Sequence, residues 1–210
     1  MNPYIILVGG GGHCKSCIDV IEQAGTFQIA GIVDVPGKLH QKILSYEIIA
    51  TDEDFPRLVK EYPNFLITVG QILSPEKRIT LFDNLKQMGT RFPVIVSPLA
   101  HISRHARVGE GTIVMHHALI NAGACIGKNC IVNTKALIEH DAVIGDHCHI
   151  STAAVINGGA RIEKHTFIGS NVMTKEYVTV GECSIIGAGS VVTKNILQDS
   201  TVMGASVKAK

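Results

Sequence analysis

The sequence has almost no net charge, no long apolar segment and few cysteines for its length. Its 210 residues carry a formal net charge of +1, which gives no electrostatic reason to expect binding to nucleic acid or to an acidic membrane surface. The apolar segment 4–8 is too short for a signal or transmembrane segment, and no later segment approaches the roughly 18 uninterrupted apolar residues of a membrane span. We therefore expect a soluble, cytoplasmic protein.

The six cysteines are too sparse for the disulfide framework of a small secreted domain. Cys14 and Cys17 form a C-x-x-C motif at a predicted helix start. The motif lacks the aromatic and proline setting of a redox helix, and no second pair completes a zinc site, so we predict small helix residues. Cys130 and Cys148 fall on small, inward positions of the repeat described next, which predicts free core thiols.

What the sequence does have is an uninterrupted six-residue period. Starting at Ile102 and ending at Val192, every sixth residue is Ile or Val, and Thr174 is the one exception. Neither the 3.6-residue period of an α-helix nor the two-residue period of an ordinary strand produces this pattern. A sandwich of short strands would need irregular turns and a broken phase.

A second period accompanies the first. Four residues after each anchor stands a smaller residue, such as Ala106, Ala124 or Ala142, and Gly or Asn often follows the anchor directly, where tight corners favour left-handed backbone. A chain that turns a corner every six residues closes into a prism whose coils pair as parallel strands. With about 18 residues in each coil, the segment predicts roughly five coils of a left-handed parallel β-helix.

Residues 1–97 follow a different pattern. The apolar segment 4–8 leads into four glycines and a helical pattern that ends near Gly25, which is the opening of a βαβ unit. We expect further strands at 29–33, 47–50, 64–69 and 91–96, and helices at 52–61 and from Ser74-Pro75 to Gly89. The chain is thus predicted to consist of an α/β Rossmann-like domain, 1–97, and a β-helix domain with a C-terminal tail, 98–210.

The glycine run indicates a nucleotide site. Glycines let backbone N–H groups approach a pyrophosphate at a helix N-terminus, and Asp34 follows Gly12 at about the spacing of an acid that holds a ribose hydroxyl. Close strand–helix packing is the alternative reason for the glycines. The dinucleotide motif is met only in part, with Cys14 at its third small position, and so short a domain lacks the second mononucleotide half of a dehydrogenase.

Among the ten histidines, His140 stands out because Glu139 and Asp141 flank it. A carboxylate beside an imidazole sets its tautomer and raises its basicity, which suits a general base near neutral pH. His149 follows half a coil later, so it belongs to another face and lines the same cleft only from a neighbouring face or subunit. A surface histidine in a charged segment is the alternative interpretation of His140.

The combination of these motifs resembles one family. The glycine loop ending at His13, the β-helix with Asn133 ahead of the 138–141 segment, and the ending 202–208 resemble the hexapeptide-repeat sugar acetyltransferases of bacteria. The most similar branches are the nucleotide-amino-sugar N-acetyltransferases of the bacillosamine pathway and the sialic acid O-acetyltransferases. The resemblance covers essentially the whole chain.

The resemblance implies a function and a set of site residues. Members transfer acetyl from acetyl-CoA, without a metal, and work as homotrimers with active sites between adjacent β-helices. Carried over, His140 is the general base and Asp141 orients it. The remaining implied contacts divide between a UDP-amino sugar (Gly10, Gly12, His13, Asp34 and Gly70) and the acetyl-CoA cleft (Asn133, His149, the N–H near Gly158, and Lys208 in the tail). Two departures from the family are Asp141, where close relatives carry Glu, and the tail 204–208, where they carry G-x-P-A-K.

We expect an N-acetyltransferase that acts on a UDP-linked amino sugar, of the 4-amino-4,6-dideoxy type, by direct attack of the amine on the thioester. Two other functions stay open. One is O-acetylation of a sialic-acid-like sugar, which the nucleotide loop makes less favoured. The other is a non-catalytic, nucleotide-binding β-helix that scaffolds a partner.

Overall fold

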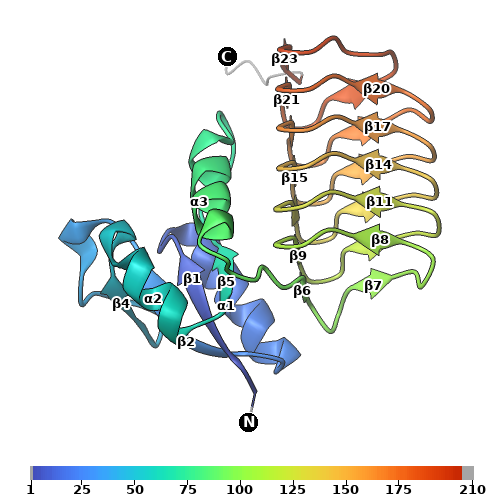
Figure 1. Ribbon diagram of the computed structural model, residues 1–210. Helices are drawn as coiled ribbons and strands as arrows, with labels where there is room; N and C mark the ends of the chain where they lie inside the picture. The colour runs from blue at the N-terminus through green and yellow to red at the C-terminus, as the bar shows by residue number, and fades with distance from the viewer. Residues whose placement is uncertain (1, 205–210) are drawn as a thin grey trace, which may run out of the picture.

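The computed structural model describes residues 2–204 and shows an α/β domain packed against the side of a β-helix (Figure 1). The β-helix stands as a tall stack of coils; most of the α/β domain lies beside its lower part, and α3 (Glu76–Gln87) extends upward along the stack. The predicted fold class is confirmed.

The α/β domain is built on one sheet in the order β3-β4-β2-β1-β5. All its neighbours are parallel except β3 and β4, a short antiparallel hairpin that the sequence did not predict. The strands span Tyr4–Val8 (β1), Gln28–Val33 (β2), Lys42–Ile43 (β3), Tyr46–Ala50 (β4) and Asn64–Ile67 (β5).

Helices cover both faces of this sheet. Helix α1 (Gly12–Ala24) ends at Gly25, which has a φ of 62° as the predicted stop signal requires. The predicted helix at 52–61 divides into a short 3-10 helix, η2 (Asp52–Asp54), and α2 (Phe55–Glu61). Helix α3 (Glu76–Gln87) begins after Ser74, whose Oγ accepts the Glu76 N–H at 3.2 Å. A second 3-10 helix, η1, spans Pro36–Lys38.

The β-helix has three flat faces, each a ladder of two-residue parallel strands. We name each face after one member: the β13 face, the β14 face and the β15 face. The β13 face contains β7 (His101–Ile102), β10 (Leu119–Ile120), β13 (Leu137–Ile138), β16 (Val155–Ile156), β19 (Met173–Thr174) and β22 (Val191–Val192). The β14 face contains β8 (Arg107–Val108), β11 (Cys125–Ile126), β14 (Val143–Ile144), β17 (Arg161–Ile162) and β20 (Thr179–Val180). The β15 face contains β6 (Ile95–Val96), β9 (Ile113–Val114), β12 (Ile131–Val132), β15 (His149–Ile150), β18 (Phe167–Ile168), β21 (Ile185–Ile186) and β23 (Thr201–Val202).

The two periods of the sequence fill the interior of this prism. Paired strands are 18 residues apart, as in Ile120 with Ile138, so each anchor lies directly above the previous one. The anchors and the smaller residues form one buried core. Cys130 and Cys148 belong to it as free, buried thiols, as predicted. Branched and small side chains alternate, which lets successive layers interdigitate at the density of a protein interior.

The two domains share a core. Helix α1 packs on the β15 face, where Ile18 and Ile21 join Ile113, Met115 and Ile131 in one apolar cluster. A polar contact lies at the edge of this cluster: His116 bridges the Asp19 carboxylate at 2.6 Å and the Ser97 hydroxyl at 2.6 Å.

The strand predicted at 91–96 was expected in the sheet of the α/β domain, and this prediction is wrong. Arg91 makes only an isolated bridge to Asn64, while Ile95–Val96 pairs with β9 and begins the β15 face. Val96 lies one six-residue step before Ile102, so the repeat extends further toward the N-terminus than the sequence analysis placed it. No helix within residues 2–204 is long and apolar enough to cross a membrane.

Candidate active site

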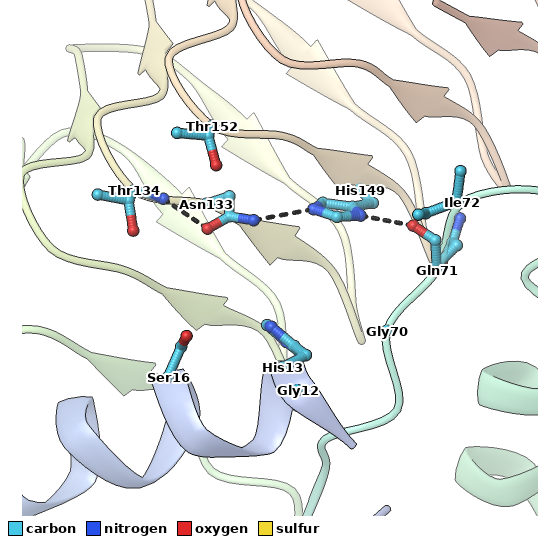
Figure 2. Close-up of a pocket in the computed structure, with 10 residues that line it drawn as sticks. All are labelled: Gly12, His13, Ser16, Gly70, Gln71, Ile72, Asn133, Thr134, His149 and Thr152. Atoms are coloured by element: carbon cyan, nitrogen blue, oxygen red, sulfur yellow. Dashed lines mark hydrogen bonds between the residues drawn. The ribbon is translucent and has the colours of Figure 1, made fainter. Parts of the chain in front are cut away.

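A cavity with a volume of about 710 Å³ lies at the joint between the domains. Its lining comes from the start of α1, from the segment after β5 and from the corner between the β15 and β13 faces: Gly12, His13, Ser16, Gly70, Gln71, Ile72, Asn133, Thr134, His149 and Thr152. Figure 2 shows His13 and Ser16 on α1 facing Asn133, Thr134 and Thr152 on the β-helix across this space. We call it the joint pocket.

His149 and Asn133 form the β-helix wall of the joint pocket. The His149 Nδ1–H donates to the Gln71 carbonyl at 2.7 Å, and the Asn133 amide Nδ2 donates to His149 Nε2 at 3.2 Å (Figure 2). Both contacts require a neutral imidazole with its proton on Nδ1. Burial lowers the pKa of His149 to about 4, which keeps the ring neutral near pH 7.

His13 forms the opposite wall. Its Nε2 lies 3.4 Å from the Cys17 Sγ, one helical turn along α1, and its ring centre is 6.5 Å from that of His149. Burial, together with the nearby Arg78 charge, lowers the pKa of His13 to about 3. Cys17 is fully buried, and burial raises the pKa of Cys14 to about 11, so neither thiol has the thiolate character of a redox motif.

Gly10 and Asp34 lie beside each other at the ends of β1 and β2, but neither lines the joint pocket. The Asp34 carboxylate accepts the Gly10 N–H at 2.8 Å, the Val35 N–H at 2.7 Å and the Lys38 ammonium at 2.9 Å. Although burial acts in the opposite direction, these hydrogen bonds hold the pKa of Asp34 below its usual value. The carboxylate therefore remains charged and already holds the glycine loop in place.

His140 and Asp141 occupy an exposed corner of the β-helix, between β13 and β14. The His140 Nδ1–H donates to Asp141 Oδ2 at 2.9 Å, which leaves Nε2 unprotonated and available to accept a proton. The hydrogen bond to Asp141 raises the pKa of His140 above its usual value. This is the arrangement that a general base needs.

Gly158 lies directly under the His140 ring in the next coil. A Cβ at Gly158 would be 2.6 Å from His140 Nε2, so only glycine leaves room for the imidazole. The N–H groups at the equivalent corners differ: that of Ala122 is bonded by Asn121 and that of His140 by Glu139, while that of Gly158 makes no hydrogen bond within the described residues. A free backbone donor thus lies next to the free Nε2.

The two groups of predicted site residues are separated within one chain. Asn133 lies at the corner before β13, and His140 lies at the corner after it, so the β13 face stands between them. The structure brings Gly12, His13, Gly70, Asn133 and His149 together, whereas His140, Asp141 and Gly158 form a second group outside the joint pocket. Lys208 lies outside the described residues.

A second cavity of about 610 Å³ continues up the β15 face from the joint pocket. Ile72 and His149 line both cavities. Its walls are mainly apolar and include the small corner residues Ser151, Gly169 and Gly187, where an extended ligand can approach the backbone closely. Within residues 2–204, no group of three or more His, Cys, Asp or Glu side chains is placed to hold a metal ion.

Several pocket residues were not predicted from the sequence: Ser16, Gln71, Ile72, Thr134 and Thr152. Gln71 has the clearest role, because its carbonyl fixes the His149 ring. The only sequence signal for it is its place directly after Gly70, at the end of a buried strand, where ligands bind in open α/β sheets.

Two family models match the chain, one for each domain. Residues 4–85 match the PglD N-terminal domain, and residues 90–202 match the GMPPB C-terminal domain. No curated protein sequence gives a significant match.

Solved structures match over nearly the full length. A variant of the perosamine N-acetyltransferase from Caulobacter crescentus, in complex with CoA and GDP-perosamine, is 28% identical over 98% of this chain and 97% of that chain, with a TM-score of 0.89. The acetyltransferase domain of PglB from Neisseria gonorrhoeae, in complex with acetyl coenzyme A, is 29% identical over 97% of both chains, with a TM-score of 0.88. WeeI from Acinetobacter baumannii shares the fold at 20% identity and a TM-score of 0.64, over 97% of both chains.

Proposed function

We propose that this chain transfers acetyl from acetyl-CoA to the amine of a nucleotide-linked sugar. By its β-helix the chain belongs to the GMPPB C-terminal domain family, and as a whole it belongs to the hexapeptide-repeat sugar acetyltransferases. The observation that carries the proposal is the joint pocket, in which the glycine-loop domain and the β-helix together line one cavity. Solved relatives hold CoA with GDP-perosamine, or acetyl coenzyme A. The acceptor in our proposal is a 4-amino-4,6-dideoxy sugar linked to a nucleoside diphosphate. The resemblance noted in the sequence implies that this nucleotide is UDP.

The ligands divide between the two cavities. In our proposal the sugar enters the joint pocket near His13, Gly70 and Asn133, and its nucleotide extends toward the glycine loop at Gly10, Gly12 and Asp34. The pantetheine arm of acetyl-CoA follows the second, mainly apolar cavity along the corner at Gly169 and Gly187. The thioester then reaches the sugar where the two cavities share Ile72 and His149.

The chemistry is direct attack in a ternary complex. The amine adds to the thioester carbonyl and gives a proton to His140 Nε2, while the Asp141 carboxylate stabilises the resulting imidazolium through Nδ1–H. The free Gly158 N–H faces the developing oxyanion. The C–S bond then breaks, and the CoA thiolate takes the proton from His140.

This mechanism needs a second copy of the chain, because His140 does not line the joint pocket of its own chain. The β13 face presents an outward row of Leu119, Leu137, Val155, Met173 and Val191, and the last two are 43% and 60% exposed. A copy packed on this row buries the apolar residues and brings the His140 corner of one prism beside the joint pocket of the next. Three prisms close such a ring, so we propose a homotrimer with a mass of three times 22.5 kDa.

A thiol-release assay tests the function. We expect free CoA with a UDP- or GDP-linked 4-amino sugar, and the ratio of the two activities identifies the nucleotide. The His140→Ala variant should lose about 10²–10⁴-fold in rate and still bind acetyl-CoA. Transfer only to a sialic-acid-type hydroxyl would show O-acetylation instead, and the absence of CoA release with every acceptor of the panel would favour a non-catalytic scaffold. Light scattering during gel filtration gives the mass of the assembly.

A further inference from the structure

Arg78 is a buried cation at the joint between the domains. It lies on α3 with 1% of its surface exposed, among the largest fully buried side chains of the protein. Its partners are oxygens without a formal charge: Nη1 donates to the Ile67 and Val69 carbonyls at 2.9 and 2.6 Å. Nη2 donates to the Asn129 carbonyl at 3.0 Å and to the Asn129 side-chain Oδ1 at 2.8 Å. A guanidinium buried without a carboxylate is costly, so its position calls for a functional reason.

The two sets of acceptors belong to different domains. Ile67 and Val69 stand at the end of β5, immediately before the pocket residues Gly70 and Gln71, whereas Asn129 is a corner residue of the β-helix with a φ of 50°. One guanidinium therefore ties the segment that carries the pocket to the prism against which it packs. The planar fork makes this possible, because its donors point in fixed directions toward both sides.

The Arg78 contacts continue as a closed ring of hydrogen bonds. The Asn129 Nδ2 donates to His147 Nδ1 at 3.0 Å, and the His147 carbonyl accepts from Gln71 Nε2 at 3.0 Å. Gln71 is joined through Gly70 to Val69, which returns the ring to Arg78. A branch leaves it at the Gln71 carbonyl, which fixes His149 and, through His149, Asn133.

We propose that Arg78 is the positioning residue of the joint pocket: by holding the 67–71 segment against Asn129, it sets the position and tautomer of His149 and the direction of the Asn133 amide. It touches no substrate itself. The Gln71 backbone carbonyl can only accept a hydrogen bond, so the His149 nitrogen that faces it must carry the proton, and the other nitrogen faces Asn133. A shift of about 1 Å in such a support can cost roughly 100-fold in rate.

Two variants break the ring in different ways. Arg78→Lys keeps a positive charge, but a single ammonium cannot reach the acceptors of both domains. Asn129→Gly removes the side chain at a corner with left-handed backbone, a conformation that glycine adopts without strain. This variant therefore still tests the proposal if the Arg78 variant does not fold. Asn171→Gly is the matched control, because Asn171 has a φ of 55° at an exposed corner outside the ring and the cavities.

The first measurement is the histidine tautomer, by ¹⁵N NMR of the full-length protein labelled at its histidines. We expect His149 to hold its proton on Nδ1 in the wild type and in Asn171→Gly. In Arg78→Lys and Asn129→Gly we expect a mixture with the Nε2 form. This readout does not need catalysis, so it tests the positioning role even if no acceptor is found and the proposed function fails.

The second measurement is steady-state kinetics, and it rests on the proposed function. We expect the KM for the nucleotide amino sugar to rise between about 10- and 100-fold in both ring variants. The KM for acetyl-CoA should rise less than that for the acceptor, because its proposed cavity shares only Ile72 and His149 with the joint pocket and is otherwise lined by residues outside the ring. Asn171→Gly should match the wild type in both. Ring variants that lose thermal stability but keep the wild-type tautomer and acceptor KM would show that Arg78 is merely structural and would overturn the inference.

Discussion

The basicity of His140 depends mainly on one neighbour, Asp141. The Asp141 carboxylate at 2.9 Å raises the pKa of the imidazole, and the base works only when its Nε2 is unprotonated. Activity should therefore rise with pH through the pKa of His140. Asp141→Asn keeps the size and tolerates the φ of 59° at this corner, but it removes the charge.

We expect Asp141→Asn to move the acidic limb of the kcat/KM profile to lower pH and to lower its plateau. The limb moves down because the imidazolium loses its ion pair, and the plateau falls because the ring is held less well. The measurement is a pH profile from 5 to 9 for both proteins. Glu139→Gln is the control, since Glu139 influences the pKa of His140 less, and its limb should move less. A limb that stays in place in Asp141→Asn would remove Asp141 from this role.

Gly158 tests the geometry of the base from the other side. Its φ lies outside the left-handed region, so alanine is allowed by the backbone, but the new Cβ would meet the His140 ring at 2.6 Å. We expect Gly158→Ala to displace the imidazole and to lower kcat by about 10- to 100-fold, without unfolding the coil. Gly37→Ala, which adds a Cβ in open space, should keep full activity. Full kcat in Gly158→Ala would mean that His140 acts from a different position.

At the scale of elements, the one anchor that is neither Ile nor Val makes a hydrogen bond that the apolar pattern does not predict. Thr174 stands where every other anchor is Ile or Val, and it is fully buried. Its Oγ1 accepts the Asn157 N–H of the neighbouring coil at 3.0 Å. Thr174→Val completes the pattern but leaves that N–H without its partner, so we expect a loss of about 1–2 kcal/mol in the free energy of unfolding. Urea titration measures it.

Thr201→Val is the control for this substitution. It makes the same exchange at an exposed strand position and should change the stability by less than about 0.5 kcal/mol. If Thr174→Val proved more stable than the wild type, the apolar pattern would outweigh the hydrogen bond, and the sequence rule would hold without exception.

Elements with a strong local signal were predictable from the sequence, and those decided by partners were not. The phase of the anchors predicts every face of the β-helix, and Gly25 predicts the end of α1. The hairpin of β3 and β4 turns at Leu44, whose φ is 54°. The turn contains no glycine or asparagine, the residues from which such a turn is usually predicted. The segment Ile95–Val96 has the composition of a sheet strand, but its pairing with β9 depends on how the two domains dock, which the sequence does not show.

The same division applies to the site. The glycine run drew attention to His13, and the resemblance to the acetyltransferase family implied Asn133 and His149; all three line the joint pocket. Arg78 is an ordinary arginine of an amphipathic helix in the sequence, and only the apposition of α3 with the corner at Asn129 reveals its function. Residues that position a site across a domain joint therefore escape single-sequence analysis.

At the scale of the whole molecule, the joint between the domains contains several histidines that become cations in acid. Its hydrogen bonds satisfy one positive charge, that of Arg78. His13, His147 and His149 surround the ring at the joint, and burial lowers their pKa values to about 3, 4 and 4. The Arg78 charge lowers the pKa of His13 and of His149 further. The hydrogen bonds of His149 also require the neutral ring.

This predicts a loss of stability in mild acid. The folded pKa of His149 lies below its unfolded value of 6.5, so the unfolded chain takes up the proton first as the pH falls. Stability is complete above about pH 6.5, declines from there to about pH 4, and has no further contribution from this group below that value. A shift of this size corresponds to the order of 3 kcal/mol for His149 alone.

Urea unfolding at pH 7.5, 6.0 and 5.0 measures the decline. His149→Phe keeps a ring of similar size without a titrating group, so its stability should fall less steeply with decreasing pH than that of the wild type. His40→Gln changes a histidine whose side chain is 81% exposed and should leave the slope unchanged. Equal slopes in all three proteins would mean that acid acts elsewhere, and that the joint tolerates a second cation beside Arg78.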